Sequence, residues 1–183
     1  MKNNWKVILL VIVGIISILL FVTFAIQGVQ NKAIGLEEQI KVADSDIKVQ
    51  EKRRVDLIYN LVDVVKEYDK HEYNTLKDAV DARSYGDGDI SEVATMINAT
   101  AEAYPELKSN ENYKQLMNEL SITENMIAQY RENYNKQIKE YNRYVRKFPA
   151  RQFLGFLGYE IVDYTYLDYN APVDAPQNLF KGD

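Results

Sequence analysis

Residues 123–149, TENMIAQYRENYNKQIKEYNRYVRKFP, decide the fold because their apolar and aromatic side chains return every seven positions. One series runs through this stretch from just upstream: Leu120, Ile127, Tyr134, Tyr141 and Phe148. A second series interleaves with it at steps of four and three: Leu116, Thr123, Tyr130, Gln137 and Tyr144. Two such series lie on one face of an α-helix. The spacing therefore predicts a long amphipathic helix over residues 110–148, ended by Pro149.

Most tyrosines of this stretch fall on the apolar stripe, so we interpret them as core residues that pack against another helix. Tyr134 and Tyr141 belong to the stripe, and Asn135 and Asn142 lie beside it. An amide in such a position either bridges two helices or faces water. The alternative is that the rings form a platform for a ligand. All four residues are therefore candidate interaction residues.

The helix that receives this face is predicted over residues 33–83. Apolar or amphipathic side chains recur there at steps of three and four: Leu36, Ile40, Ala43, Ile47, Leu57, Leu61, Val64 and Tyr68. This period is typical of a helix and not of a strand. Gln50 and Arg54 interrupt the apolar seam and indicate a less buried stretch.

A turn and a second helix are predicted after this first helix. Residues 84–89, SYGDGD, combine two glycines with turn-forming aspartates and are expected to break the chain direction. Asp89, with Glu92 three residues later, has the spacing of a capping box. This pattern predicts a helix over residues 90–104, which Pro105 ends.

The C-terminal region is predicted to contain one more short helix. Residues 150–162 are apolar enough for a short fourth helix after Pro149. Residues 163–183 contain two prolines, few helix formers and an acidic surplus. We expect them to form an extended tail.

Residues 7–26, VILLVIVGIISILLFVTFAI, carry no charge, and their only polar members are Ser17 and Thr23. Twenty helical residues span about 30 Å, the thickness of the hydrocarbon core of a bilayer. The segment is longer than the apolar region of a cleaved signal peptide, and no Ala-x-Ala site follows it. We expect an uncleaved signal-anchor that holds the chain in the lipid bilayer. A cleaved signal peptide and a buried helix of a soluble protein are the alternatives.

The charges that flank this segment favour one orientation. Lys2, Lys6 and the amino group of Met1 precede it, whereas Lys32 and Lys41 follow it among acidic residues. Positive charge is retained on the cytoplasmic side of a membrane. We therefore expect a single-pass protein with a cytoplasmic N-terminus and the helical region outside.

The composition excludes several classes of function. The chain has 183 residues, which suits one domain plus an anchor, and its net charge of −5 opposes binding to nucleic acid. It contains no cysteine, so it has neither a disulfide framework nor a thiolate metal site. His71 is the one histidine, and an HExxH zinc motif would need a second where Thr75 stands. We expect no catalytic residue, metal or cofactor.

One four-residue pattern in the sequence is similar to a motif of hydrolases. Ser45 and Lys48 formally match Ser-x-x-Lys, but the companion Lys-Thr-Gly element is missing, so we read the match as chance.

Arg131 follows Glu124 by seven residues, one position beyond the core stripe. We expect both to pair with charges of the first helix, such as Asp56 or Arg53. The alternative is that they bind a ligand.

Two long stretches, residues 53–84 and 103–149, resemble the LemA family of bacterial membrane-anchored proteins. The resemblance rests on these motifs among others: Asp56-Leu57-Ile58, Asn60-Leu61-Val62, Tyr104-Pro105-Glu106-Leu107, Thr123-Glu124-Asn125, Tyr134-Asn135, Tyr141-Asn142 and Phe148-Pro149. It implies a long helical bundle on a single membrane helix, no established enzymatic activity, and scaffolding in the cell envelope. Tyr59 stands where the family pattern usually has proline, so the first helix is expected to be straighter here.

The fold class that follows is all-α. After the flank 1–6, a transmembrane helix (residues 7–26) leads into an elongated antiparallel bundle (27–162) of three to four helices, two of them long and coiled-coil-like, and then into the tail (163–183). We expect a membrane-anchored scaffold that binds protein partners or itself. A membrane-remodelling or lysis-type oligomer is the main alternative, since Gly14 and Ser17 allow close packing of spans.

Overall fold

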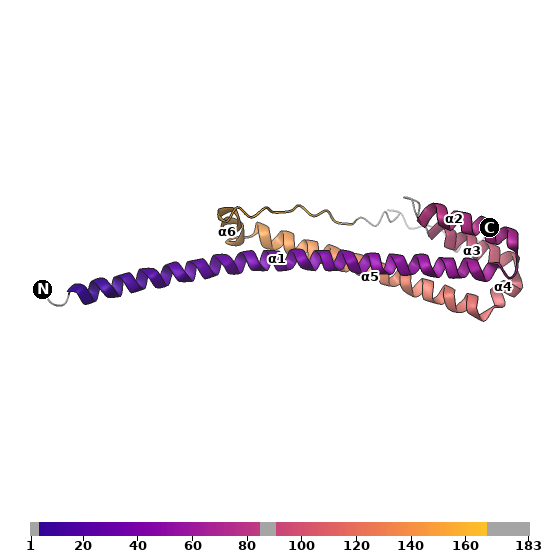
Figure 1. The fold of residues 1–183 in the computed structure, drawn as a ribbon, viewed down its shortest axis with the longest axis horizontal. Coiled ribbons are helices and arrows are strands. Elements are labelled where there is room, and N and C mark those ends of the chain that lie inside the picture. Colours follow the sequence, from indigo (N-terminus) through magenta and orange to yellow (C-terminus); the bar gives the residue numbers. More distant parts are fainter. Residues whose placement is uncertain (1–3, 85–90, 168–183) are drawn as a thin grey trace, which may run out of the picture. The chain divides into compact units, whose positions relative to one another are not determined.

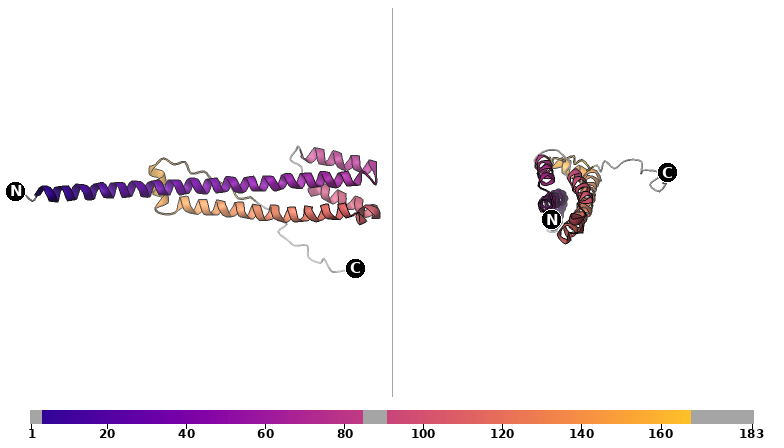
Figure 2. Two further views of the ribbon diagram at one scale, coloured as in Figure 1. Left: turned by 60° about the horizontal axis from the view of Figure 1, so that its bottom comes forward. Right: turned by 90° about the vertical axis from the view of Figure 1, so that its right-hand side faces the viewer.

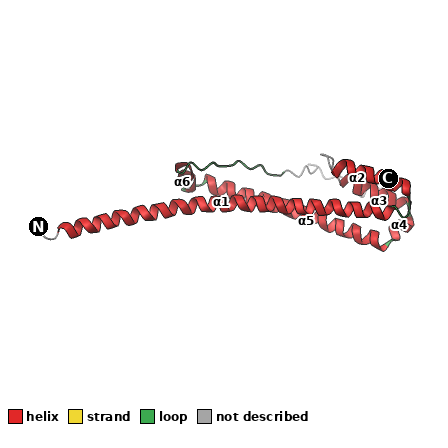
Figure 3. Ribbon diagram, viewed as in Figure 1, coloured by secondary structure: helices red, strands yellow, loops and turns green. Residues whose placement is uncertain are grey.

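The computed structural model describes residues 4–84 and 91–167, and all regular secondary structure within these ranges is helical (Figures 1 and 3). The helices are α1 (Asn4–Val65), α2 (Lys70–Ser84), α3 (Ser91–Ala103), α4 (Pro105–Ser109), α5 (Glu111–Arg146) and α6 (Ala150–Phe156). The expected all-α class is confirmed. The expected turn at residues 84–89 and its Asp89 cap lie almost wholly outside the described residues.

The chain divides into two compact units. Residues Ile34–Gln137 form the central unit. Residues Met1–Ala33 and Ile138–Asp183 form the terminal unit, of which the structure describes residues 4–33 and 138–167.

The central unit is built around an antiparallel pairing of α1 with α5. Successive ion pairs join Glu51 to Arg131 and Arg54 to Glu124, so the residue numbers rise along one helix as they fall along the other. Helices α2 and α3 lie beside the C-terminal part of α1 (Figure 2). The apolar core of this unit draws on all five helices from α1 to α5 and consists of Leu57, Ile58, Leu61, Val62, Val65, Leu76, Val80, Val93, Ile97, Ala101, Leu107, Tyr113 and Leu120.

The prediction of one unbroken helix over residues 33–83 is wrong, because α1 ends at Val65 and α2 begins at Lys70. The carboxylate of Asp69 causes the break. Its Oδ1 accepts the backbone N–H groups of His71 (2.7 Å) and Glu72 (3.0 Å), which gives α2 its own N-cap. Asp69 and Glu72 have capping-box spacing, which is the local signal that the apolar period concealed.

The predicted helix over residues 90–104 corresponds to α3, and Pro105 both follows its end and begins the short helix α4. This additional helix was not expected. Asn110 then caps α5, because its Oδ1 accepts the N–H of Tyr113 at 3.1 Å. The long helix predicted over residues 110–148 is confirmed as α5 apart from its first position and its last two.

Five of the ten residues of the heptad stripe of α5 are buried and four are half-buried. Leu120, Ile127 and Thr123 are buried in the central unit, and Tyr141 and Tyr144 are buried in the terminal unit. Phe148 is the exception, with 80% of its surface exposed. The helix ends at Arg146, so the helical period no longer places position 148 on the stripe.

The N-terminal part of α1 is apolar and lies open to the surroundings. Exposed side chains run from Trp5 to Phe24, and the first half-buried ones are Ala25 and Ile26. Ser17 and Thr23 donate their hydroxyls to backbone carbonyls four residues earlier, at 2.9 and 2.8 Å, so neither leaves an unsatisfied donor. This helix is long and apolar enough to cross a membrane.

The short helix predicted within residues 150–162 is α6, which ends at Phe156. Gly158 ends it in the left-handed region, at φ 65°. The N–H of Gly158 bonds to the carbonyl of Gly155 (3.2 Å) and that of Tyr159 to the carbonyl of Leu154 (3.0 Å), which is a Schellman motif. Residues 159–167 have no regular secondary structure.

Candidate interaction site

Three ion pairs join α1 to α5 in the central unit. Arg131 pairs with Glu51 at 2.8 Å, Arg54 with Glu124 at 3.5 Å, and Arg53 with Glu119 at 3.8 Å. Glu124 and Arg131 therefore pair with charged residues of α1, as predicted. The partners expected for them, Asp56 and Arg53, are wrong.

Asp56 and Asn60 lie on the exposed surface of α1. Asp56 forms no ion pair within residues 4–84 and 91–167. Asn60 lines a shallow groove together with Asn112 and Leu116 of α5. Of the sequence-predicted residues, these two remain available on the surface, whereas Glu124 and Arg131 already have partners.

The predicted tyrosines and asparagines of α5 fall in both units. Tyr134 and Asn135 are half-buried in the central unit. In the terminal unit, Tyr141 is fully buried, accepts the N–H of Val162 at 3.2 Å and packs edge-on against Tyr164, with ring centroids 5.3 Å apart. Core packing, and not an open platform, accounts for Tyr141.

Asn142 is half-buried in the same unit, and its Oδ1 has no hydrogen-bond partner among the described residues. Tyr144 nearby donates its hydroxyl to the carbonyl of Val29 at 3.2 Å. Burial raises the pKa of Tyr144, so the hydroxyl stays protonated as a donor. The C-terminal part of α5 is therefore held against α1 by a specific polar contact.

A hydrogen-bonded junction closes the far end of α1 in the central unit. Tyr104 donates its hydroxyl to Asp69 at 2.8 Å, and Asn110 donates its amide to the hydroxyl of Tyr68 at 2.7 Å. The backbone N–H of Glu72, and then the Tyr104 hydroxyl, lower the pKa of Asp69. The same carboxylate raises the pKa of Tyr104. Two residues at the α1–α2 turn thus fix the entries to α4 and α5.

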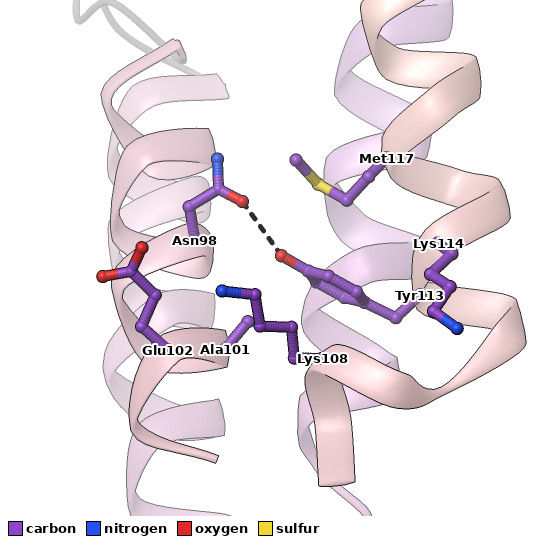
Figure 4. A pocket seen from close by; sticks show the side chains of 7 residues that line it. All are labelled: Asn98, Ala101, Glu102, Lys108, Tyr113, Lys114 and Met117. Atoms are coloured by element: carbon purple, nitrogen blue, oxygen red, sulfur yellow. Dashed lines mark hydrogen bonds between the residues drawn. The ribbon is translucent and has the colours of Figure 1, made fainter. Parts of the chain in front are cut away.

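An open groove of about 580 Å³ lies between α3, α4 and α5 in the central unit (Figure 4). Its lining residues are Asn98, Ala101, Glu102, Lys108, Tyr113, Lys114 and Met117. Tyr113 donates its hydroxyl to Asn98 at 3.0 Å, and this contact joins α5 to α3 across the groove. Burial, with a smaller contribution from Glu102, raises the pKa of Tyr113.

The groove combines an apolar floor with a charged rim. Ala101, Tyr113 and Met117 supply the apolar surface, whereas Glu102 and Lys108 are exposed charges of opposite sign. Such a surface suits a polypeptide segment that brings both apolar and charged side chains. Sequence reasoning missed this site, because its residues lie on three helices whose meeting depends on the turns at Pro105 and Asn110.

The arrangement offers little for catalysis or metal binding. Lys48 of the Ser-x-x-Lys pattern donates to Asp44 at 2.6 Å, and this bond raises its pKa, the opposite of what a general base requires. Within the part of the chain that the structure describes, no three His, Asp or Glu residues come together in a group that could hold a metal ion.

Sequence comparison finds both a family model and individual proteins to which this chain is similar. Residues 43–180 match the family model described as the LemA family. Two Paramagnetospirillum magneticum proteins, magnetosome proteins MamQ 2 and MamQ 1, are each 21% identical over 193 residues, covering 85% of this chain and 71% of theirs. Magnetosome protein MamQ of Magnetospirillum gryphiswaldense is 29% identical over 93 residues, covering 50% of this chain and 34% of its own.

Proposed function

The chain belongs to the LemA family, and on that premise we propose that it is a membrane-anchored interaction protein whose central unit binds a segment of a partner protein. The observation that carries this proposal is the groove between α3, α4 and α5. Its acidic and basic rim and its apolar floor are the features by which a protein surface selects a polypeptide.

The apolar part of α1 supports the membrane anchor. Burying one large apolar side chain is worth about 1.5–3 kcal/mol, so an exposed run of them is strongly destabilising in water. The bilayer removes this cost while the helix satisfies its own backbone hydrogen bonds. A wash of membranes with alkaline carbonate is expected to leave the chain in the pellet, and its release would contradict the anchor.

The groove favours a protein ligand over a small molecule. It is open along one side, and its charged side chains stand on flexible stems at the rim, as Lys108 and Lys114 do. A small ligand requires a more enclosed site, which buries most of its surface. A helix or extended segment of another protein can lie along an open groove and contact both rims.

Site-specific photocrosslinking in native membranes tests this function. A photoreactive amino acid at Lys114, on the rim, is expected to capture a defined partner that mass spectrometry identifies. The matched control carries it at Ile122, which is exposed on the same helix but does not line the groove. Equal capture from both positions, or none from Lys114, would contradict a groove-directed interaction.

We also propose that the N-terminus is cytoplasmic and that the helical units lie outside, as the flanking charges favour. Protease added to intact cells is then expected to degrade the central unit. Complete protection in intact cells, with degradation after lysis, would establish the opposite orientation.

A further inference from the structure

The chain carries a basic corner where α5 ends and α6 begins, which we define as residues 143–156. Two large aromatic side chains stand out from it, since Phe148 is 80% exposed and Phe156 is 81% exposed. Its cations are also exposed: Arg143, Arg146, Lys147 and Arg151. No acidic residue occurs between Tyr141 and Tyr159, although the whole chain has a net charge of −5.

The basic corner belongs to the same unit as the apolar part of α1, and a specific contact fixes its level along that helix. The Tyr144 hydroxyl lies 3.2 Å from the carbonyl of Val29, and Lys32 lies 5.2 Å from the centre of the Tyr144 ring. Val29 follows the last residue of the apolar segment, Ile26, by three positions, which is about 4.5 Å along a helix.

The C-terminal end of α5 points toward the apolar segment, since α5 runs antiparallel to α1 (Figures 1 and 2). Arg146, the last residue of α5, follows Tyr144 by two positions, about 3 Å along a helix, and Phe148 lies in the turn directly after it. The end of α5, with Phe148 directly after it, therefore lies near the level of the last turn of the apolar segment. In a bilayer, that level is the boundary between acyl chains and headgroups.

We propose that the basic corner is a second membrane contact, which docks on the surface of the bilayer that holds α1. Phe148 and Phe156 enter the boundary between headgroups and acyl chains, and the four cations bind the phosphates of anionic lipids. Aromatic side chains are favoured at this depth, and exposed Lys and Arg residues beside them are attracted to anionic headgroups.

Charge and position both favour the bilayer as the occupant of this surface. Arg146 has a partner, Asp163, at 3.2 Å, but both side chains are mostly exposed, so this pair is weak in water and leaves Arg146 able to bind a lipid phosphate. The basic corner is also held close to the apolar segment, because Tyr144 bonds to Val29, three residues beyond Ile26. The four cations lie far from the span along the sequence, so they do not alter the flanking charges that set its orientation.

The absence of cysteine makes a direct test possible. Phe148→Cys and Phe156→Cys each provide one labelling site and leave the other phenylalanine in place. The full-length variants are labelled with an environment-sensitive fluorophore and reconstituted in nanodiscs of phosphatidylcholine, with or without phosphatidylglycerol. Val49→Cys is the matched control, because Val49 is exposed on α1 in the central unit.

Nitroxide-labelled lipid is expected to quench both corner labels strongly and the Val49→Cys label weakly, with more quenching of the corner labels when phosphatidylglycerol is present. Aqueous iodide is expected to show the opposite order. The proposal is overturned if iodide reaches the two corner labels as readily as the control in anionic nanodiscs.

Removal of two cations tests the contribution of charge. Lys147→Gln/Arg151→Gln is expected to shift the docking equilibrium. The ratio of molecules whose basic corner is docked on the bilayer to molecules whose basic corner is not should fall by about fivefold for each charge removed. Lys136→Gln/Lys139→Gln removes two exposed cations of α5 outside the corner and is expected to leave the ratio unchanged. Equal effects of the two double variants would overturn the assignment of the anionic lipid to this corner.

Discussion

Asn110 performs two tasks in the central unit, and its substitution separates them. Its Oδ1 caps α5 by accepting the N–H of Tyr113, and its Nδ2 donates to the hydroxyl of Tyr68 at the end of α1. Loss of an N-cap costs about 1 kcal/mol. Loss of one side-chain hydrogen bond costs about 1 kcal/mol more. Asn110→Ala is therefore expected to lower the free energy of unfolding by about 2 kcal/mol.

A double-mutant cycle with Tyr68 isolates the second task. Tyr68→Phe alone is expected to cost about 1 kcal/mol, and Asn110→Ala in that background only about 1 kcal/mol more, since the amide has already lost its acceptor. The coupling energy is then about 1 kcal/mol. Urea unfolding of the full chain in a non-ionic detergent, followed by far-UV circular dichroism, measures the free energy of unfolding of each protein in the cycle.

Asn112→Ala provides the control, because Asn112 is exposed on α5 two positions from Asn110. It is expected to change the free energy of unfolding by less than about 0.5 kcal/mol. The reasoning would be refuted if Asn110→Ala cost no more than Asn112→Ala, or if its cost were the same with tyrosine and with phenylalanine at position 68.

Three further outcomes are expected from the central unit. Leu61→Ala removes a fully buried side chain and should cost about 2–5 kcal/mol in urea unfolding; a smaller loss would show that the core is loosely packed there. Glu51→Gln breaks a half-exposed ion pair with Arg131 and should lower the free energy of unfolding by at most about 1 kcal/mol. This loss should become smaller at about 1 M salt, and a loss that salt does not reduce would contradict the ion-pair contribution. The pKa of Asp69 in the folded state lies below its ordinary value of 3.8. The ionised carboxylate therefore stabilises the fold fully above pH 3.8, and this stabilisation is lost as the pH falls through the folded-state pKa. Acid unfolding of Asp69→Asn should therefore depend less on pH below about 4 than that of the unchanged chain, and equal slopes would contradict the role of this carboxylate.

The seven-residue period of α5 predicted this helix and its buried face well, because a period of apolar residues directly reports which side of a helix is covered. The same signal failed at residues 66–69. Val64 and Tyr68 continue the apolar step across the break, so the period alone predicts one helix. The cap formed by Asp69 is a local feature, and it outweighed the longer pattern.

The contacts between helices were less predictable. Sequence spacing shows that Glu124 and Arg131 lie on one side of α5, but it does not fix how far α5 slides along α1. Packing of the core sets that register, and it brings Arg131 to Glu51 instead of to Asp56. The groove of α3, α4 and α5 was missed for a similar reason, because its residues approach one another through two turns and carry no shared motif.

The contact between Tyr144 and Val29 joins residues 115 positions apart and has a consequence for biosynthesis. A ribosome delivers the N-terminal segment first, and it reaches the membrane while most of the chain is still unmade. The central unit draws on an uninterrupted stretch, so it can fold next. The terminal unit can form only after Tyr144 has been synthesised, because its contact with Val29 closes the long loop between the two residues. A nascent chain arrested before Tyr144 should therefore be inserted and partly folded, yet lack the finished membrane-proximal structure.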